Sequence, residues 1–171
     1  MSIPTFKTIL YATDLGKNMR PAFRHAISIA QQYQAKIIML HVAEPIGSTG
    51  MAVLELYVPD MSDDFEHEEL QGIIKRMEQR LEDFYTEELG KDADLVSDVS
   101  VVTGRPAEEI QKFAAAHDVD LIVMGTHTSP SFGGSLLGST ARKLINISDR
   151  PVLVVPVRKQ ARKTEKAPVK K

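Results

Sequence analysis

The stretch that most constrains the fold runs over residues 119–157, VDLIVMGTHTSPSFGGSLLGSTARKLINISDRPVLVVPV. Two apolar runs of strand length, 119–124 and 152–157, flank a loop rich in small residues and a helical pattern at 139–147. Glycines lie where the loop meets the helix, and the N–H groups of a first helical turn lack intrahelical partners and carry a partial positive charge. The stretch therefore predicts a β-loop-α-β unit that holds an anion, and nucleotide phosphate is the first candidate.

The remainder of the chain repeats the alternation of apolar strand-like runs with segments whose apolar residues recur at helical spacing. The strands are expected at 7–13, 36–42 and 98–103, and the helices at 18–33, 65–89 and 107–117. Residues 46–64 show no sustained period, and we predict a loop or lid there. The alternation predicts an α/β fold class, a doubly wound, five-stranded parallel sheet with helices on both faces and a ligand site beyond the carboxyl ends of its strands.

Length, cysteine content and charge limit the structural and functional classes to which the chain can belong. The chain has 171 residues and no cysteine, which suits one domain with its own core and excludes disulfide scaffolds, thiolate nucleophiles and cysteine-ligated metals. We expect a single domain over 1–157 and a basic, disordered tail over 158–171. That tail contains seven of the 21 Lys and Arg residues and only one of the 23 Asp and Glu residues. The first 157 residues therefore carry a net charge of −8.

An acidic body argues against a nucleic-acid partner, since such binding relies on a basic face. No apolar run approaches the roughly 18 residues that span a bilayer. The N-terminal MSIPTFKTILYATD lacks the pattern of a signal peptide. We therefore expect a cytoplasmic protein without a membrane partner.

Two common nucleotide motifs are missing. Residues 133–140, GGSLLGST, approach the P-loop pattern G-x-x-x-x-G-K-[ST], but Ser139 stands where the lysine that reaches the β and γ phosphates is needed. No G-x-G-x-x-G follows the first predicted strand, which argues against a dinucleotide-binding Rossmann domain. The anion site is therefore of another kind.

The chain resembles the universal stress protein family. Nucleotide-binding members of that family carry the pattern G-x2-G-x9-G-[ST] after their fourth strand, and Gly125, Gly138 and Ser139 fall at this spacing. The segments ILYATD, LHV, TGRP and PVLVVP also resemble the family and occur in the same order. Thr128 replaces the second glycine of the pattern, and its side chain would either crowd a ligand or donate a hydrogen bond of its own.

The resemblance implies that the chain binds ATP, and that any Mg²⁺ comes with the triphosphate. The ends of the first two strands would contact adenosine, with Asp14 near the ribose and the backbone of Val42 at the adenine edge. The end of the fourth strand would flank the ribose and first phosphates, and the start of the following helix would hold phosphate oxygens. The implied site consists of Ala12, Thr13, Asp14, Val42, Met124, Gly125, Thr126, His127, Thr128, Gly138, Ser139 and Thr140.

Several of these residues have simpler explanations. Asp14 is equally suited to capping a helix or closing a turn. Ser139 suits the N-cap position of a helix with or without a ligand. His127 has the character of a surface histidine in a loop, and His41, inside an apolar run, that of a satisfied core residue.

The sequence offers no nucleophile, no general base with an orienting partner and no metal-ligand spacing such as H-E-x-x-H. We therefore do not predict an enzyme. Slow ATP hydrolysis or autophosphorylation is the most that the resemblance implies.

The last predicted strand, 152–157, is apolar and expected at the sheet edge, where an exposed edge invites pairing with another chain. The resemblance implies a homodimer through this edge. Two functions stay open: a dimeric stress-response or regulatory protein that binds ATP and acts on a protein partner, and a dimeric interaction module of the same fold without a nucleotide. The second differs from the first in having an empty site.

Overall fold

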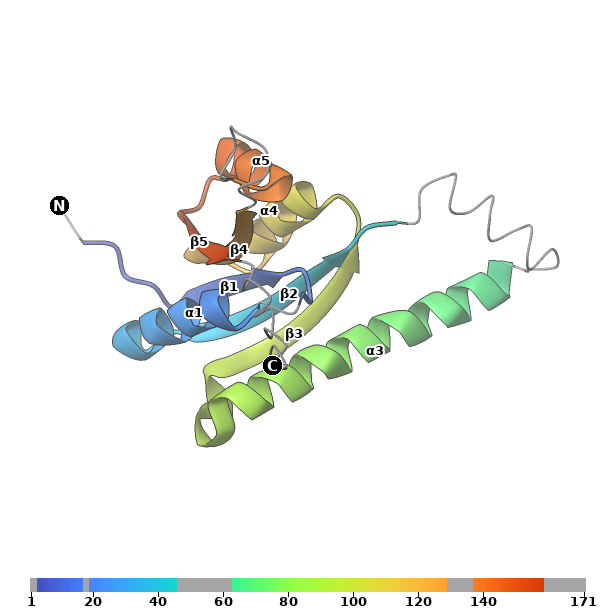
Figure 1. Cartoon of the computed structure of the whole chain (residues 1–171), viewed down its shortest axis with the longest axis horizontal. Helices are drawn as coiled ribbons and strands as arrows, with labels where there is room; N and C mark the ends of the chain where they lie inside the picture. Colours follow the sequence, from blue (N-terminus) through green and yellow to red (C-terminus); the bar gives the residue numbers. More distant parts are fainter. Residues whose placement is uncertain (1–2, 17–18, 46–62, 129–136, 159–171) are drawn as a thin grey trace, which may run out of the picture.

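Five parallel strands form one sheet in the order β3-β2-β1-β4-β5 (Figure 1). The strands are β1 (Thr8–Thr13), β2 (Lys36–Ala43), β3 (Val96–Thr103), β4 (Leu121–Thr128) and β5 (Val152–Arg158). The computed structural model describes residues 3–16, 19–45, 63–128 and 137–158. The chain runs outward from β1 in one direction through β2 and β3, and in the other through β4 and β5, so the predicted doubly wound α/β fold is confirmed.

Helices cover both faces of the sheet (Figure 1). On one face lie α1 (Arg20–Tyr33) and α3 (Asp63–Leu89), and on the other lie α4 (Pro106–Ala116) and α5 (Ser139–Ile147). A short 3-10 helix, η1 (Gly90–Leu95), joins α3 to β3. Side chains of β1 alternate between the faces, because Ile9 and Tyr11 pack in the cluster with α1 and α3 whereas Leu10 and Ala12 pack with α4 and α5.

Most predicted bounds agree with the structure within one or two residues, but β4 is longer than predicted. The apolar run ends at Met124, whereas β4 continues to Thr128 because its last residues pair with Val155 to Arg158 of β5. The prediction that Gly125 belongs to a loop is therefore wrong. Backbone pairing with the edge strand, and not an apolar side-chain pattern, makes this segment a strand.

The long helix α3 packs on the sheet unevenly. Leu81 is fully buried, whereas Leu70 and Ile73, which lie closer to the N-terminus of the helix, are 42% and 37% exposed. Figure 1 shows the N-terminal half of α3 extending past the sheet. The helix ends at Leu89, as predicted, and the following Gly90 has a φ of +54°, which favours glycine.

Three predictions fall on segments outside the described residues: the lid, except for its last two residues, which begin α3; the tail beyond Arg158; and the loop over 129–136. Within the described ranges, no helix is long and apolar enough to cross a membrane.

Candidate functional site

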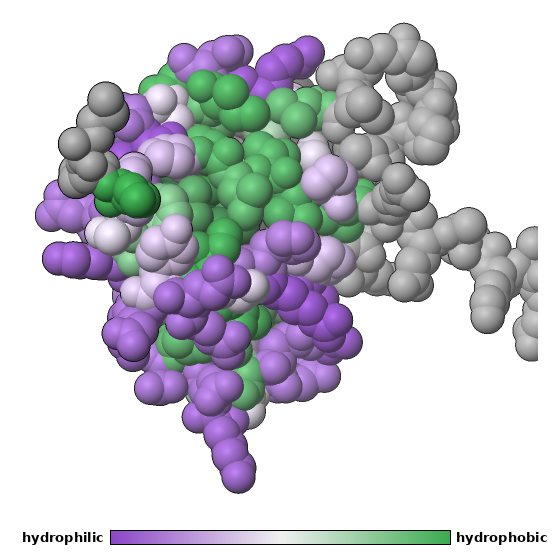
Figure 2. Space-filling view, turned by 90° about the vertical axis from the view of Figure 1, so that its left-hand side faces the viewer, coloured by the Kyte–Doolittle hydropathy of each residue, from purple (hydrophilic) through white to green (hydrophobic). Residues whose placement is uncertain are grey.

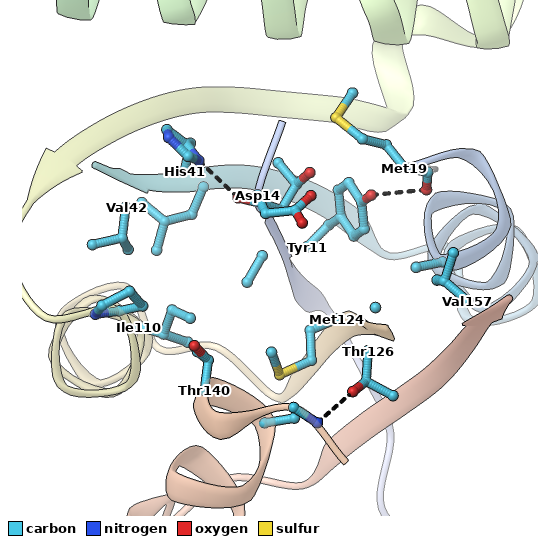
Figure 3. Close-up of a pocket in the computed structure, with 18 of the residues that line it drawn as sticks. Tyr11, Asp14, Met19, His41, Val42, Ile110, Met124, Thr126, Thr140 and Val157 are labelled. Carbon is cyan, nitrogen blue, oxygen red and sulfur yellow. Dashed lines mark hydrogen bonds between the residues drawn. The ribbon is translucent and has the colours of Figure 1, made fainter. Parts of the chain in front are cut away.

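A cavity of about 520 Å³ lies at the carboxyl ends of β1, β2 and β4, beside the point where the strand order reverses (Figure 3). All but two of the residues implied by the resemblance line it: Ala12, Thr13, Asp14, Val42, Met124, Gly125, Thr126, Gly138, Ser139 and Thr140. For the other two, His127 and Thr128, the structure describes only the backbone, which pairs with Val157 and Arg158 of β5. The fold thus gathers segments from the whole chain around one space.

The turn after β1 presents Asp14 to the cavity. The Asp14 carboxylate accepts a hydrogen bond from the Gly16 N–H at 2.8 Å, and the Thr13 hydroxyl accepts one from the Leu15 N–H at 3.2 Å. Arg80 of α3 donates to the Leu15 carbonyl at 2.9 Å. Asp14 therefore closes a turn and does not cap a helix, since the N-cap of α1 is Met19.

Tyr11 fixes the start of α1 against β1. Its hydroxyl donates to the Met19 carbonyl at 2.9 Å, and both side chains line the cavity. Burial raises the pKa of the Tyr11 phenol, an effect that the Thr13 hydroxyl partly offsets. Tyr11 therefore stays a neutral donor, and it serves to shape the wall.

The end of β2 forms the next part of the wall. His41 Nδ1 lies 2.8 Å from the Thr13 carbonyl, and because a carbonyl only accepts, this nitrogen carries the proton. His41 is thus satisfied, as predicted, but it is half-buried and lines the cavity. The Glu44 carboxylate, also exposed to the cavity, lies one residue beyond the end of β2.

The side of the cavity formed by β2 and α4 is apolar. Val42 and Ile110 are 8% and 4% exposed, and Leu40 and Pro106 line the same space. Figure 3 shows Val42 and Ile110 on one side of the cavity and Thr126 on the other. We call this wall, made of Leu40, Val42, Pro106 and Ile110, the apolar wall.

No sequence pattern identified the α4 part of the apolar wall. The turn at Gly104 carries the chain from β3 into α4, and Ile110 follows Pro106 by about one helical turn. This spacing, together with the position of the turn at the carboxyl end of a strand, was the sequence signal that could have placed Ile110 at the cavity. Lining residues from the core, such as Met19 and Met77, gave no signal apart from ordinary apolar periodicity.

The opposite side consists of β4 and the first turn of α5. Ser139 is the first residue of α5, and Gly138 is the N-cap, so the prediction that Ser139 occupies the cap position is wrong. The first main-chain bond of the helix runs from the Arg142 N–H to the Gly138 carbonyl. The N–H groups of Ser139, Thr140 and Ala141 consequently have no acceptor among the described residues. We call these three groups, with Gly138 and Thr126, the polar wall.

Gly125 has a packing role that the motif did not indicate. A Cβ added at Gly125 would lie 3.1 Å from Cγ2 of Val157 and 3.6 Å from the Cβ of Ala22. The glycine therefore lets β5 and α1 pack closely against the end of β4. At Gly138, by contrast, an added Cβ would lie 3.3 Å from Thr126 Oγ1, inside the polar wall.

Charge is distributed unevenly around the cavity. Asp14 and Glu44 bring carboxylates to the β1 and β2 side, and no described lining residue is a lysine or arginine. On the other side, the N-terminus of α5 supplies a partial positive charge. In the described part of the chain, no group of three His, Asp or Glu side chains is arranged to hold a metal ion.

Comparison with known families and sequences gives consistent matches along nearly the whole folded part. A model of the Universal stress protein family matches residues 5–156. Universal stress protein MJ0577 of Methanocaldococcus jannaschii is 32% identical over 155 residues, which cover 88% of this chain and 94% of that protein. A universal stress protein of Thermus aquaticus is 33% identical over 150 residues, with coverage of 88% and 98%.

Solved structures match in the same way. The structure of MJ0577 aligns with a TM-score of 0.67 at 30% identity, and the match covers 92% of this chain and all of that one. A universal stress protein in complex with cAMP aligns with a TM-score of 0.55 at 22% identity over 90% of this chain. At that identity the second likeness shows the fold alone.

Proposed function

The chain belongs to the universal stress protein family, and we propose that it is a dimeric stress-response or regulatory protein that binds ATP in the cavity at the ends of β1, β2 and β4. The observation that carries this proposal is the pairing of an apolar wall with the N-terminus of a helix across one cavity. A volume of about 520 Å³ falls within the usual range for small-molecule sites. Such a site suits a ligand with a flat apolar end and an anionic end.

The distribution of charge sets the direction of the ligand. Adenine packs against Val42 and Ile110 of the apolar wall, with the Val42 backbone at its edge. The Asp14 carboxylate accepts hydrogen bonds from ribose hydroxyls. The phosphates lie at Ser139 and Thr140, where the N–H groups of the first helical turn and the helix dipole favour negative charge. The reverse orientation would bring the phosphates beside the carboxylates of Asp14 and Glu44, and like charges repel.

The residues present fit a phosphate at this position. Since Gly138 has no side chain, the space in front of Thr126 stays open to the ligand. With no lysine or arginine among the described lining residues, a Mg²⁺ ion bound to ATP supplies most of the positive charge that the triphosphate needs. Binding of ATP is therefore expected to depend on Mg²⁺.

The proposed dimer forms through the β5 edge. Figure 2 views the side of the molecule on which β5 lies in Figure 1, and apolar side chains gather in the middle of that face. Val152, Leu153 and Val154 of β5 are only half-buried, and Ile145 and Ile147 of α5 are 47% and 41% exposed. An apolar edge strand beside an apolar helix surface supports pairing with a second copy.

Size-exclusion chromatography with light scattering tests the dimer. We expect wild type to elute as a dimer at micromolar concentration, and Val154→Lys on β5 to elute as a monomer, because a charge on an edge strand opposes pairing. Val102→Lys is the matched control, since Val102 is also half-buried on an edge strand, β3, and packs in the same core cluster as Val154. A wild type that is a strict monomer would contradict the proposal.

The β5 face also supports the alternative function, a dimeric interaction module with an empty cavity, because that face does not involve the cavity residues other than Val157.

One experiment separates the two functions. Small molecules are released from purified protein by denaturation and identified, and ATP is then titrated calorimetrically into nucleotide-free protein. The ATP proposal expects retained adenine nucleotide or binding heat. Absence of both would leave the interaction module.

A further inference from the structure

Thr126 is a buried polar residue, with 4% of its surface exposed, and it lines the cavity. It lies near the end of β4, where it pairs in register with Pro156 of β5. A buried hydroxyl is costly unless it forms hydrogen bonds. Its partners therefore indicate what it does.

The Thr126 oxygen accepts a hydrogen bond from the Gly138 N–H at 2.8 Å. Gly138 is the N-cap of α5, and no side chain of its own caps the helix. The bond crosses from the sheet to the helix and joins residues twelve apart in the sequence. It thereby fixes the position of the first turn of α5 relative to β4, and with it the width of the polar wall.

The same hydroxyl keeps an unused capacity. A threonine hydroxyl offers one donor proton and two acceptor lone pairs, and the Gly138 bond uses one lone pair. No acceptor for the proton lies among the described residues. A buried donor that faces a cavity, beside three N–H groups that have no acceptor among the described residues, is suited to an anionic acceptor in that cavity.

We propose that Thr126 is a positioning residue for the ligand's phosphate. Its hydroxyl accepts the Gly138 N–H to hold α5 against β4, and it donates its own proton to a phosphate oxygen. The first role is a property of the protein without ligand. The second rests on the proposed ATP binding.

The first role is tested in protein free of nucleotide, by amide hydrogen exchange resolved by residue. In Thr126→Val, which keeps the shape of the side chain but lacks the hydroxyl, the Gly138 amide should exchange about fivefold faster, as for the loss of one neutral hydrogen bond. Thr126→Ser should keep wild-type protection. Thr8→Val makes the same change at the amino end of β1, away from the cavity, and should leave Gly138 unaffected. Equal exchange of the Gly138 amide in wild type and Thr126→Val would overturn the role in positioning α5.

The second role is tested by calorimetric titration with ATP and with adenosine. Thr126→Val should weaken ATP binding about tenfold or more, the usual effect of losing a hydrogen bond to a charged group, and leave adenosine binding unchanged. Thr126→Ser should restore ATP affinity to near wild type. An equal loss for ATP and adenosine, or no loss for ATP, would overturn the contact with phosphate.

The two tests also separate this inference from the proposed function. If wild type binds no nucleotide while Thr126→Val accelerates exchange at Gly138, ATP binding and the phosphate contact fail together, and the link between β4 and α5 stands. If Thr126→Val does not fold, Thr126→Ala takes its place, because a smaller residue at this site avoids overpacking. The expected results are the same for both variants.

Discussion

The two walls of the cavity differ in the chemical groups that they present to it. The apolar wall of β2 and α4 presents side chains, and Val42 and Ile110 would contribute by shape and by removal of apolar area from water. The polar wall of β4 and α5 presents backbone N–H groups, ordered by a single hydroxyl on Thr126. Recognition by backbone requires residues without bulk at fixed positions, whereas recognition by apolar area is compatible with many core residues. The polar wall should therefore be the more sensitive to substitution.

The largest effect is expected from Gly138→Val, which blocks the polar wall alone. The added Cβ would lie 3.3 Å from Thr126 Oγ1, and the two methyl groups would extend into the space for phosphate. Loss of two charge-assisted hydrogen bonds should weaken ATP binding about a hundredfold or more, with adenosine affected only a few-fold. Calorimetry with both ligands measures the contrast.

Gly72→Val is the matched control for this substitution. Gly72 lies in α3, and among the described residues an added Cβ there meets only Arg76 Nη1, at 3.7 Å. This variant should bind ATP like wild type. If Gly138→Val reduced adenosine and ATP affinity by the same factor, the two walls would not have separate roles.

Removal of Mg²⁺ should cause the next largest loss of ATP affinity. Since no described lining residue is a lysine or arginine, the triphosphate relies on the metal and the helix N-terminus for positive charge. Titration in the presence of a chelator should weaken ATP binding about tenfold, on the order of one charge interaction at the protein surface. Adenosine affinity should not respond to the chelator, and a response would mean that the metal acts on the fold instead.

Ile110→Ala changes the apolar wall alone. Deleting this buried side chain should lower the free energy of unfolding by about 2–4 kcal/mol. It should also weaken ATP and adenosine about fivefold, by the same factor for both, as expected for apolar area lost near the base. Urea unfolding and calorimetry measure the two effects.

Leu144→Ala controls for the loss of stability in that experiment. Leu144 is fully buried in the same core cluster but does not line the cavity. It should lose similar stability and keep wild-type affinity for both ligands. Reduced affinity in Leu144→Ala would show that the effect of Ile110→Ala comes from general loosening.

Glu44→Gln tests the direction of the ligand with a small expected effect. Its carboxylate is exposed and lies on the side away from the polar wall, so solvent and salt screen it from the phosphates. ATP affinity should rise about twofold or less, in line with an exposed charge. A gain of tenfold or more would place the phosphates beside β2 and reverse the proposed orientation.

The smallest effect concerns an ion pair between α4 and α5, outside the residues that form the two walls. Glu108 of α4 bonds with Lys143 of α5, and the hydrogen bond from Lys143 lowers the pKa of the Glu108 carboxyl. A carboxyl with a lowered pKa in the folded state stabilises the protein above its unfolded-state pKa, and this contribution is lost as the pH falls through the folded-state pKa. Because Glu108 is exposed to solvent screening, the contribution is small.

Thermal unfolding of wild type and Glu108→Gln over a range of pH checks this pair. The variant should melt slightly below wild type at neutral pH, and the difference should vanish in acid. A difference that grew as the pH fell would contradict the assigned direction of the pKa shift.

The difference between the walls also explains what the sequence could predict. The polar wall left visible signals, since Gly138 and Ser139 stand at a fixed spacing and begin a helix whose range, 139–147, the structure confirms. The apolar wall left none at Ile110, because an isoleucine that lines a cavity has the same periodicity as one that fills a core. Tertiary packing alone brings α4 over the end of β2.

The fold class was predictable for a simple reason: β1, β2, β4 and β5 each contain an apolar run of strand length, as is typical of parallel strands covered by helices. The carboxyl end of β4 was not predictable, because Gly125 to Thr128 form a strand only through pairing with β5. The exact cap of α5 was also missed. Gly138 takes the cap position because the Thr126 hydroxyl bonds its N–H from outside the helix, which no local pattern shows.

The most direct test of the division between the walls is a pair of NMR titrations on ¹⁵N-labelled protein freed of nucleotide. Adenosine should shift the amides of Val42 and Ala43 and leave those of Ser139 and Thr140 unchanged. ATP with Mg²⁺ should shift both sets. If ATP shifts neither set, the proposed function fails. If adenosine shifts Ser139 and Thr140 while leaving Val42 unmoved, the ligand lies in the opposite direction.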